Sequence, residues 1–191
     1  MEVFVKRENW DGGIWMKLPA SEEQAEQVQK ELTGYYPSRM IPFIGDVKAP
    51  VAGLAHLLIG EFVFQEPNLG QLNYLAAKIG SWSEQERAVF ETVLQNEKPD
   101  SLLRIVEAMD QLDQYECYPE IKSLEQYGHD LFEREGRTLP VELTGYFDYE
   151  AYGRFQMKTS DRLTDEGLVT RSKTPKPAVG KKQNPKVVHP G

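Results

Sequence analysis

The sequence predicts an α+β protein made of three small domains followed by a disordered basic tail. Two strand-like runs stand first in the chain, at residues 2–7 and 14–18. Three helical patterns with brief connections follow between about 69 and 114, and a mixed third part begins at Tyr118-Pro119. These shifts divide the chain into an α/β domain (1–66), a helical domain (67–116), an α/β domain (117–168) and the tail (169–191).

The first domain has clear start and stop signals. A turn containing Asp11-Gly12-Gly13 joins the first two strands. Ser21 and Gln24 have the spacing of a capping box, which predicts a helix that ends at Gly34. Residues 40–47 are expected to form a third strand at a sheet edge, because Pro42 cannot donate a ladder hydrogen bond.

The middle domain is predicted to be a small helical bundle. A helix begins near Leu69 and ends at Gly80, and Ser83 with Glu86 opens the next one through a second capping box. The third covers residues 101–113, with an expected apolar face of Leu102, Leu103, Val106, Met109 and Leu112.

The last part repeats this mixture of elements. Ser123 and Gln126 cap a helix that runs through Glu135. Residues 146–154 predict a short helix and residues 155–159 a strand. From Thr170 the chain is Lys, Pro, Gly and polar residues without periodicity, which is typical of disorder.

Charge is distributed unevenly over the 191 residues. The net charge of −8 divides into +6 for residues 169–191 and −14 for residues 1–168. So acidic a body disfavours nucleic acid and anionic membranes as partners and suits a basic protein. The single cysteine, Cys117, excludes an internal disulfide, and the chain has neither a signal peptide nor a run of membrane-spanning length. We therefore expect a cytoplasmic protein.

The acidic charge is concentrated between residues 84 and 150, which hold 17 Asp and Glu against six Lys and Arg. Such a stretch is either an ordinary solvated surface or a surface that binds a basic partner. The candidate partner-binding carboxylates are Glu84, Glu86, Glu91, Glu97, Asp100, Glu107, Asp110, Asp113, Glu116, Glu120, Glu125, Asp130, Glu133, Glu135, Asp148 and Glu150.

Catalytic and cofactor motifs are missing from the sequence. It contains no Gly-x-Gly-x-x-Gly, phosphate-binding loop, His-Glu-x-x-His or Cys-x-x-Cys. The carboxylates are dispersed and lack the Asp/Asn/Gly loop of a calcium site. We predict no enzymatic activity, no cofactor and no metal.

Three segments in register resemble the ArdA antirestriction family. Residues 70–76 (Gly-Gln-Leu-Asn-Tyr-Leu-Ala) resemble the start of its helical middle section. Residues 112–119 (Leu-Asp-Gln-Tyr-Glu-Cys-Tyr-Pro) resemble its Leu-Asp-x-Tyr-x-x-Tyr-Pro passage. Leu139-Pro140 followed by residues 145–154 (Gly-Tyr-Phe-Asp-Tyr-Glu-Ala-Tyr-Gly-Arg) is close to its Leu-Pro…Tyr-Ile-Asp-Tyr-Glu-Ala-x-x-Arg signature.

This resemblance implies an elongated, dimeric DNA mimic whose carboxylates are arrayed like the phosphates of duplex DNA. Such a protein occupies the DNA-binding groove of a type I restriction–modification enzyme. Two alternatives remain open at this point. One is a mimic that inhibits another DNA-binding defence complex, such as a CRISPR nuclease, and the other is a non-mimetic acidic adaptor.

Overall fold

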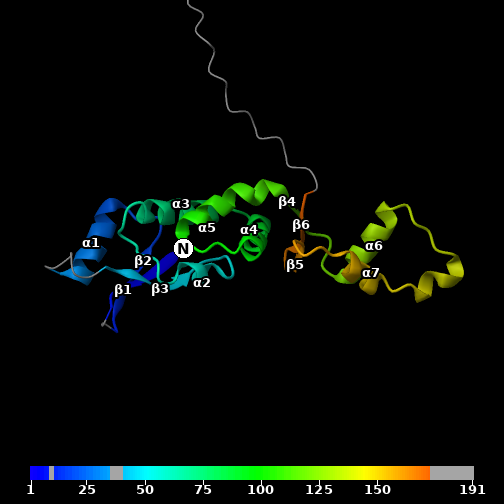
Figure 1. Ribbon diagram of the computed structural model, residues 1–191, viewed down its shortest axis with the longest axis horizontal. Coiled ribbons are helices and arrows are strands. Elements are labelled where there is room, and N and C mark those ends of the chain that lie inside the picture. The colour runs from blue at the N-terminus through cyan, green and yellow to red at the C-terminus, as the bar shows by residue number, and fades with distance from the viewer. Residues whose placement is uncertain (9–10, 35–40, 173–191) are drawn as a thin grey trace, which may run out of the picture.

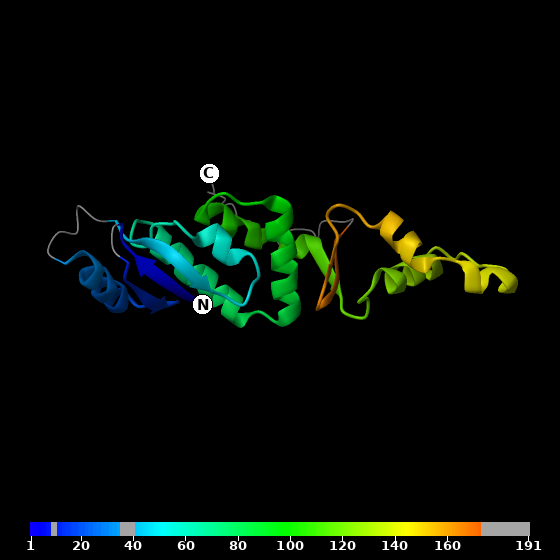
Figure 2. The ribbon, with the colours of Figure 1, turned by 90° about the horizontal axis from the view of Figure 1, so that it is seen from below.

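The computed structural model describes residues 1–8, 11–34 and 41–172, and these form a molecule drawn out along one axis (Figure 1). A three-stranded sheet lies at one end, a group of helices in the middle, and a second small sheet joins these helices to a helical hairpin at the far end (Figures 1 and 2). The mixture of helices and small sheets confirms the expected α+β class. Each helix within the described ranges is too short or too polar to cross a lipid bilayer.

The first sheet has β1 (Glu2–Lys6) between β2 (Gly13–Lys17) and β3 (Phe43–Lys48), and both pairings are antiparallel. Alternation along β1 turns Val3 and Val5 into the core and leaves Phe4 on the opposite face. The three predicted strands and the edge position of the third are confirmed, although the third begins at Phe43, after Pro42. Met40, which was expected in that strand, lies outside the described residues.

Helices cover the inner face of this sheet. The predicted capping box of Ser21 and Gln24 opens α1 (Glu22–Thr33), and Gly34 follows it with a positive φ of 58°. Helix α2 (Leu54–Leu58) is short, and α3 (Asn68–Ser81) carries the Leu-Asn-Tyr motif. Asn73 of that motif accepts a hydrogen bond from Ala20 N (2.8 Å) and donates one to Ala20 O (2.9 Å), which fastens α3 to the end of β2.

One hydrophobic core unites the first two expected domains. It joins Val3 and Val5 of the sheet to Leu72 and Leu75 of α3 and to Phe90 of α4 (Glu84–Glu97). The separate short cores expected for residues 1–66 and 67–116 are therefore wrong. Fully buried apolar side chains from both sides of residue 66 belong to this one core.

The third expected helix is shorter than its pattern predicted. Helix α5 (Leu102–Ala108) passes into a 3-10 helix, η2 (Met109–Gln114). Its buried face is Leu102, Ile105 and Ala108, whereas Leu103 is exposed. The helix lies against both α3 and α4, so the contacted face is rotated from the one that periodicity alone selected.

The second sheet corrects the expected end of the folded chain. Strand β6 (Gly167–Arg171) pairs antiparallel with β4 (Tyr115–Tyr118) and β5 (Arg162–Thr164), in the order β4-β6-β5. Residues 169–171 were assigned to the tail, yet Val169 is fully buried in the main core. The expected boundary after residue 116 also falls inside β4. Residues 173–191, which hold the rest of the predicted tail, lie outside the described residues.

A helical hairpin is inserted between β4 and β5. It consists of α6 (Leu124–Arg134), the 3-10 helix η3 (Val141–Tyr146) and α7 (Tyr149–Gln156), and we call it the hairpin (Figure 1). The predicted strand at 155–159 is wrong, because α7 continues through Gln156 and a turn follows. A Cβ on Gly128 or Gly153 would overlap backbone of the facing helix, so glycine at both positions permits the close approach of α6 and α7.

Candidate functional site

The acidic surface is built first by α4. Ser83 Oγ accepts from Glu86 N (3.2 Å) while Glu86 Oε2 accepts from Ser83 N (2.7 Å), which confirms the second capping box. The hydrogen bonds from Ser83 lower the pKa of Glu86, so this carboxylate stays ionised at the positive end of the helix dipole. The helix buries Phe90 and Val93, which leaves Glu84 and Glu97 in solvent.

The chain then turns and continues the acidic surface along α5 and η2. Lys98 ends α4 with a positive φ of 47°, and Ser101 Oγ accepts from Arg104 N (3.5 Å) to start α5. Because Leu102, Ile105 and Ala108 point into the core, Glu107 of α5 is exposed, and Asp100 before the helix and Asp110 and Asp113 of η2 are exposed as well. We define the central acidic face as six exposed carboxylates of α4, the turn after it, α5 and η2: Glu84, Glu97, Asp100, Glu107, Asp110 and Asp113. Glu86 is also exposed on α4 but is left out, because the capping box with Ser83 already holds its carboxylate.

Strand β4 extends this surface, because its side chains alternate between the core and solvent. Tyr115 is buried and Glu116 is exposed, where its carboxylate accepts a hydrogen bond from the Tyr118 hydroxyl (2.7 Å). That hydrogen bond, followed by burial, raises the pKa of Tyr118. Glu120 is exposed in the turn that leads to the hairpin.

Three of the seven carboxylates on the hairpin form salt bridges with arginines, and a fourth lies beside a histidine. Arg134 contacts Asp130 (2.9 Å) and Arg154 contacts Glu150 (2.5 Å). Arg137 contacts Glu135 (2.5 Å), and His129 lies 3.3 Å from Glu133. A hydrogen bond from the Tyr152 hydroxyl, with Arg137 nearby, lowers the pKa of Glu135. Asp148 accepts from Ala151 N (2.8 Å) and caps α7, and Glu125 is exposed in the first turn of α6.

The central acidic face and the hairpin differ in how many of their carboxylates form salt bridges. Within the described residues, Glu107 is the one member of the central acidic face that forms a salt bridge, with Arg104 at 2.7 Å. The other five members form none with any residue that the structure describes. Most of the predicted carboxylates are exposed as expected; Glu91 and Asp130 are half-buried.

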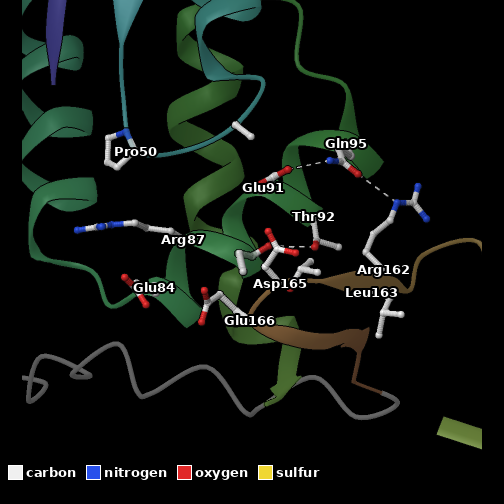
Figure 3. A pocket seen from close by; sticks show the side chains of 13 residues that line it. Pro50, Glu84, Arg87, Glu91, Thr92, Gln95, Arg162, Leu163, Asp165 and Glu166 are labelled. Atoms are coloured by element: carbon white, nitrogen blue, oxygen red, sulfur yellow. Dashed lines mark hydrogen bonds between the residues drawn. The ribbon is translucent and has the colours of Figure 1, made fainter. Parts of the chain in front are cut away.

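A groove of about 500 Å³ runs between α4 and the β5–β6 turn, next to the central acidic face (Figure 3). Its acidic side chains are Glu84 and Glu91 from α4 and Asp165 and Glu166 from the turn. Gln95 connects Glu91 to Arg162, because it donates to Glu91 Oε1 (3.2 Å) and accepts from Arg162 Nε (3.2 Å) (Figure 3). Burial and the nearby charge of Asp165 raise the pKa of Glu91.

Asp165 and Glu166 were missed by the sequence analysis. They stand beyond the acidic stretch of residues 84–150, and pairing of β6 with β4 brings them beside α4. Asp165-Glu166-Gly167 has the composition of a hairpin turn between two strands, and this signal could have located them.

The structure gives this surface no assembled catalytic or metal-binding group. No cluster of three or more potential metal ligands occurs in the described part of the chain. The Cys117 thiol donates to the carbonyl of Glu166 (3.7 Å), and burial raises its pKa. His129 is engaged elsewhere, by Glu133 and by the ring of Tyr149 (4.8 Å between centroids). What this surface offers is ionised carboxylates in solvent, which is a means of binding cationic groups.

Comparison with known proteins agrees with the three motifs. No curated protein matches the chain. The family model described as antirestriction protein (ArdA) matches residues 11–170, a range that includes the first helix, the central acidic face and the hairpin. The chain therefore belongs to the ArdA family of antirestriction proteins.

Proposed function

We propose that this protein inhibits a type I restriction–modification enzyme by presenting carboxylates where the enzyme would hold DNA phosphates. The observation that carries the proposal is the central acidic face, with five exposed carboxylates lacking salt bridges to described residues, in a member of the antirestriction family. The elongated outline supports it, because charges spread along an axis resemble a duplex more than charges around a sphere do (Figure 1).

The physical basis is competition for one basic surface. Duplex DNA carries a negative charge about every 1.7 Å of its axis, and its protein partners neutralise it with Lys and Arg. Contacts to phosphates position a protein on DNA but carry no sequence information. An acidic protein that occupies those cations therefore acts whatever sequence the enzyme recognises. It acts as a stoichiometric inhibitor in the cytoplasm, not as an enzyme.

A charge-reversal experiment tests this function. Glu107, Asp110 and Asp113 all face solvent, so the triple change to Lys should leave the fold intact. Inhibition of a type I enzyme should be competitive with duplex DNA, weaken as salt rises, and fall at least tenfold in the triple variant. A folded variant with unchanged inhibition would remove this surface from the interface.

The same assay separates the other candidates. Inhibition of a different DNA-binding defence nuclease, with none of the type I enzyme, would change the target but keep the mimicry. Binding to a basic protein without competition by duplex DNA would identify an acidic adaptor instead.

We also propose that two copies associate through the hairpin. Val141, Tyr146 and Phe155 are 87%, 86% and 84% exposed, and apolar groups of this size in solvent mark interaction sites. Light scattering should give about twice the 21.8 kDa of one chain. Tyr146→Ser with Phe155→Ser should shift the mass towards one chain, and an unchanged dimer would place the interface elsewhere.

A further inference from the structure

Three aromatic rings and three lysines share the face of the first sheet that points away from the core. Phe4 of β1 lies opposite Trp15 of β2, with ring centroids 5.3 Å apart. Phe43 of β3 lies opposite Lys6 of β1. Lys17 and Lys48 flank Glu2 in the next row of the same face. We call this surface the aromatic–lysine face; its members are Phe4, Lys6, Trp15, Lys17, Phe43 and Lys48.

The whole-chain charge conceals this face. Its strand residues carry three lysines against Glu2 and Asp46, while residues 1–168 together carry −14. Helix α3 lies on the other side of the sheet, where Val3 and Val5 belong to the same hydrophobic core as Leu72 (Figures 1 and 2). Trp15 is 40% exposed, so a large apolar ring is held in solvent beside basic groups.

Two glycines leave room for the Phe4 and Lys6 side chains to lie against the strands. A Cβ on Gly13 would stand 2.5 Å from the Phe4 ring, and one on Gly45 would stand 2.7 Å from the Lys6 chain. Both distances are too short for real contacts, so a side chain at either position would lift the ring or the lysine off the sheet. The glycines therefore let these groups lie flat on the strands.

Ammonium groups occupy the open sides of two rings. Lys48 Nζ lies 4.0 Å from the centroid of Trp15, and Lys6 Nζ lies 5.5 Å from that of Phe43. Lys48 also lies 3.8 Å from Glu2, but its side chain is 64% exposed and both contacts are the weak surface kind. Because these contacts are weak, a planar group can replace the Lys48 ammonium on the Trp15 ring, and the ammonium can then pair with an anionic group of the same ligand.

We propose that the aromatic–lysine face binds single-stranded nucleic acid. Unpaired bases stack on exposed rings of an open sheet, and lysines around the rings neutralise the phosphates between them. An acidic peptide would use the lysines but leave the rings without a function, and duplex DNA keeps its bases stacked inside the helix. The central acidic face stands on α4, α5 and η2, whereas these lysines stand on the strands of the first sheet, and salt screens charges more than about 8 Å apart at physiological ionic strength.

The full chain can be tested with labelled 15-residue oligo(dT) and oligo(rU) by fluorescence anisotropy at a series of salt concentrations up to about 0.15 M. Trp15→Leu keeps an apolar side chain but removes the stacking surface, and should weaken binding about tenfold. Trp15→Tyr should retain most of the affinity. Lys17→Gln should weaken binding and reduce the slope of log affinity against log salt concentration by the amount that corresponds to about one phosphate contact. The control Lys98→Gln, at the end of α4, should change neither the affinity nor the slope.

Contributions of the lysines in residues 173–191 are the same in all of these variants, so they cancel in the comparison. Lys17→Gln decides the test if Trp15→Leu does not fold. Equal binding of oligo(dT) and oligo(rU) would mean that bases and phosphates suffice, and a preference would identify DNA or RNA. Unchanged affinity in the Trp15 and Lys17 variants, equal affinity for duplex, or tighter binding of a poly-glutamate peptide would each overturn the proposal.

Discussion

The central acidic face and the hairpin are both rich in carboxylates, but they differ in what those carboxylates contact. On the hairpin, Arg134, Arg137 and Arg154 each lie within 3 Å of an acidic oxygen. On the central acidic face, Arg104 is the one base within the described residues that forms such a pair. A carboxylate beside a guanidinium projects little net charge, because the two fields largely cancel beyond a few ångströms.

Because of this difference, a count of acidic residues overstates the negative charge that the hairpin can present in place of DNA phosphates. Its acids and bases stabilise α6 and α7 through pairs four residues apart, such as Asp130 with Arg134. The central acidic face has few such pairs, so its charge is available to a partner. The hairpin is better suited to holding its exposed apolar groups in place, as the dimer that we propose requires.

The largest expected effect comes from the close contact within the hairpin. In Gly153→Ala the new methyl would overlap the carbonyl of Leu124, which should destabilise the hairpin by about 3 kcal/mol. Hydrogen exchange should accelerate in α6 and α7 but not in α3 or α4. Gly145→Ala is the matched control, because a methyl there meets no atom within 4 Å. Fast exchange throughout the chain would mean that the hairpin does not open independently.

Removing charge from each region tests the comparison directly. Asp100, Asp110 and Asp113 changed to Asn remove three carboxylates that form no salt bridge with described residues, and should weaken inhibition about tenfold or more. Asp130→Asn with Glu133→Gln and Glu150→Gln removes three that have partners, and should weaken it less than threefold. Both are measured as the concentration for half-inhibition at fixed DNA and salt. A larger loss from the hairpin variant would reverse the assignment.

The family could be predicted from the sequence because its motif residues determine the architecture. Asn73 fastens α3 to Ala20, Asp148 caps α7, and Gly153 permits the contact between the hairpin helices. Each role restricts its position to one or a few residue types, so it leaves a readable pattern. The helix starts at Ser21, Ser83 and Ser123 were readable for the same reason, since each side chain accepts a backbone hydrogen bond. Ser101 has the same role in the structure, although the sequence placed that helix start at Pro99-Asp100.

The remaining features depend on contacts between distant segments. Strand β6 was placed partly in the tail, because its pairing with β4 joins residues about fifty positions apart. The groove carboxylates Asp165 and Glu166 were missed with it. Likewise, strand pairing brings Trp15, Phe4 and Lys48 to one face of the sheet, and the net charge of the chain does not reveal that grouping. Exposure of the carboxylates could be predicted from helical periodicity, but their pairing depends on side-chain positions.

Glu91 offers a smaller test at the border of the central acidic face. Burial and Asp165 raise its pKa, so the folded protein binds more protons than the unfolded chain around that pKa. Its ionisation therefore opposes folding as pH rises through that range, and the penalty disappears as pH falls. Glu91→Gln should raise the melting temperature at pH 7 by an amount worth less than about 1 kcal/mol, since water screens the half-exposed carboxyl. The gain should vanish near pH 4, and exposed Glu84→Gln is the control; a gain independent of pH would exclude this cause.

The smallest expected effect concerns the basic residues after the second sheet. A chain ended after residue 168 would lose Val169 and the rest of β6, so the cut belongs after Ser172. Residues 173–191 contain five lysines and no acid, and in our interpretation they compete weakly for the central acidic face. Their removal should strengthen inhibition about two- to threefold at low salt and have no effect at high salt, where screening ends the competition. Changing the five lysines to Gln in the full chain should reproduce the gain if charge is the cause. Unchanged or weaker inhibition after the cut would exclude self-competition, and it would show that residues 173–191 do not compete for the central acidic face.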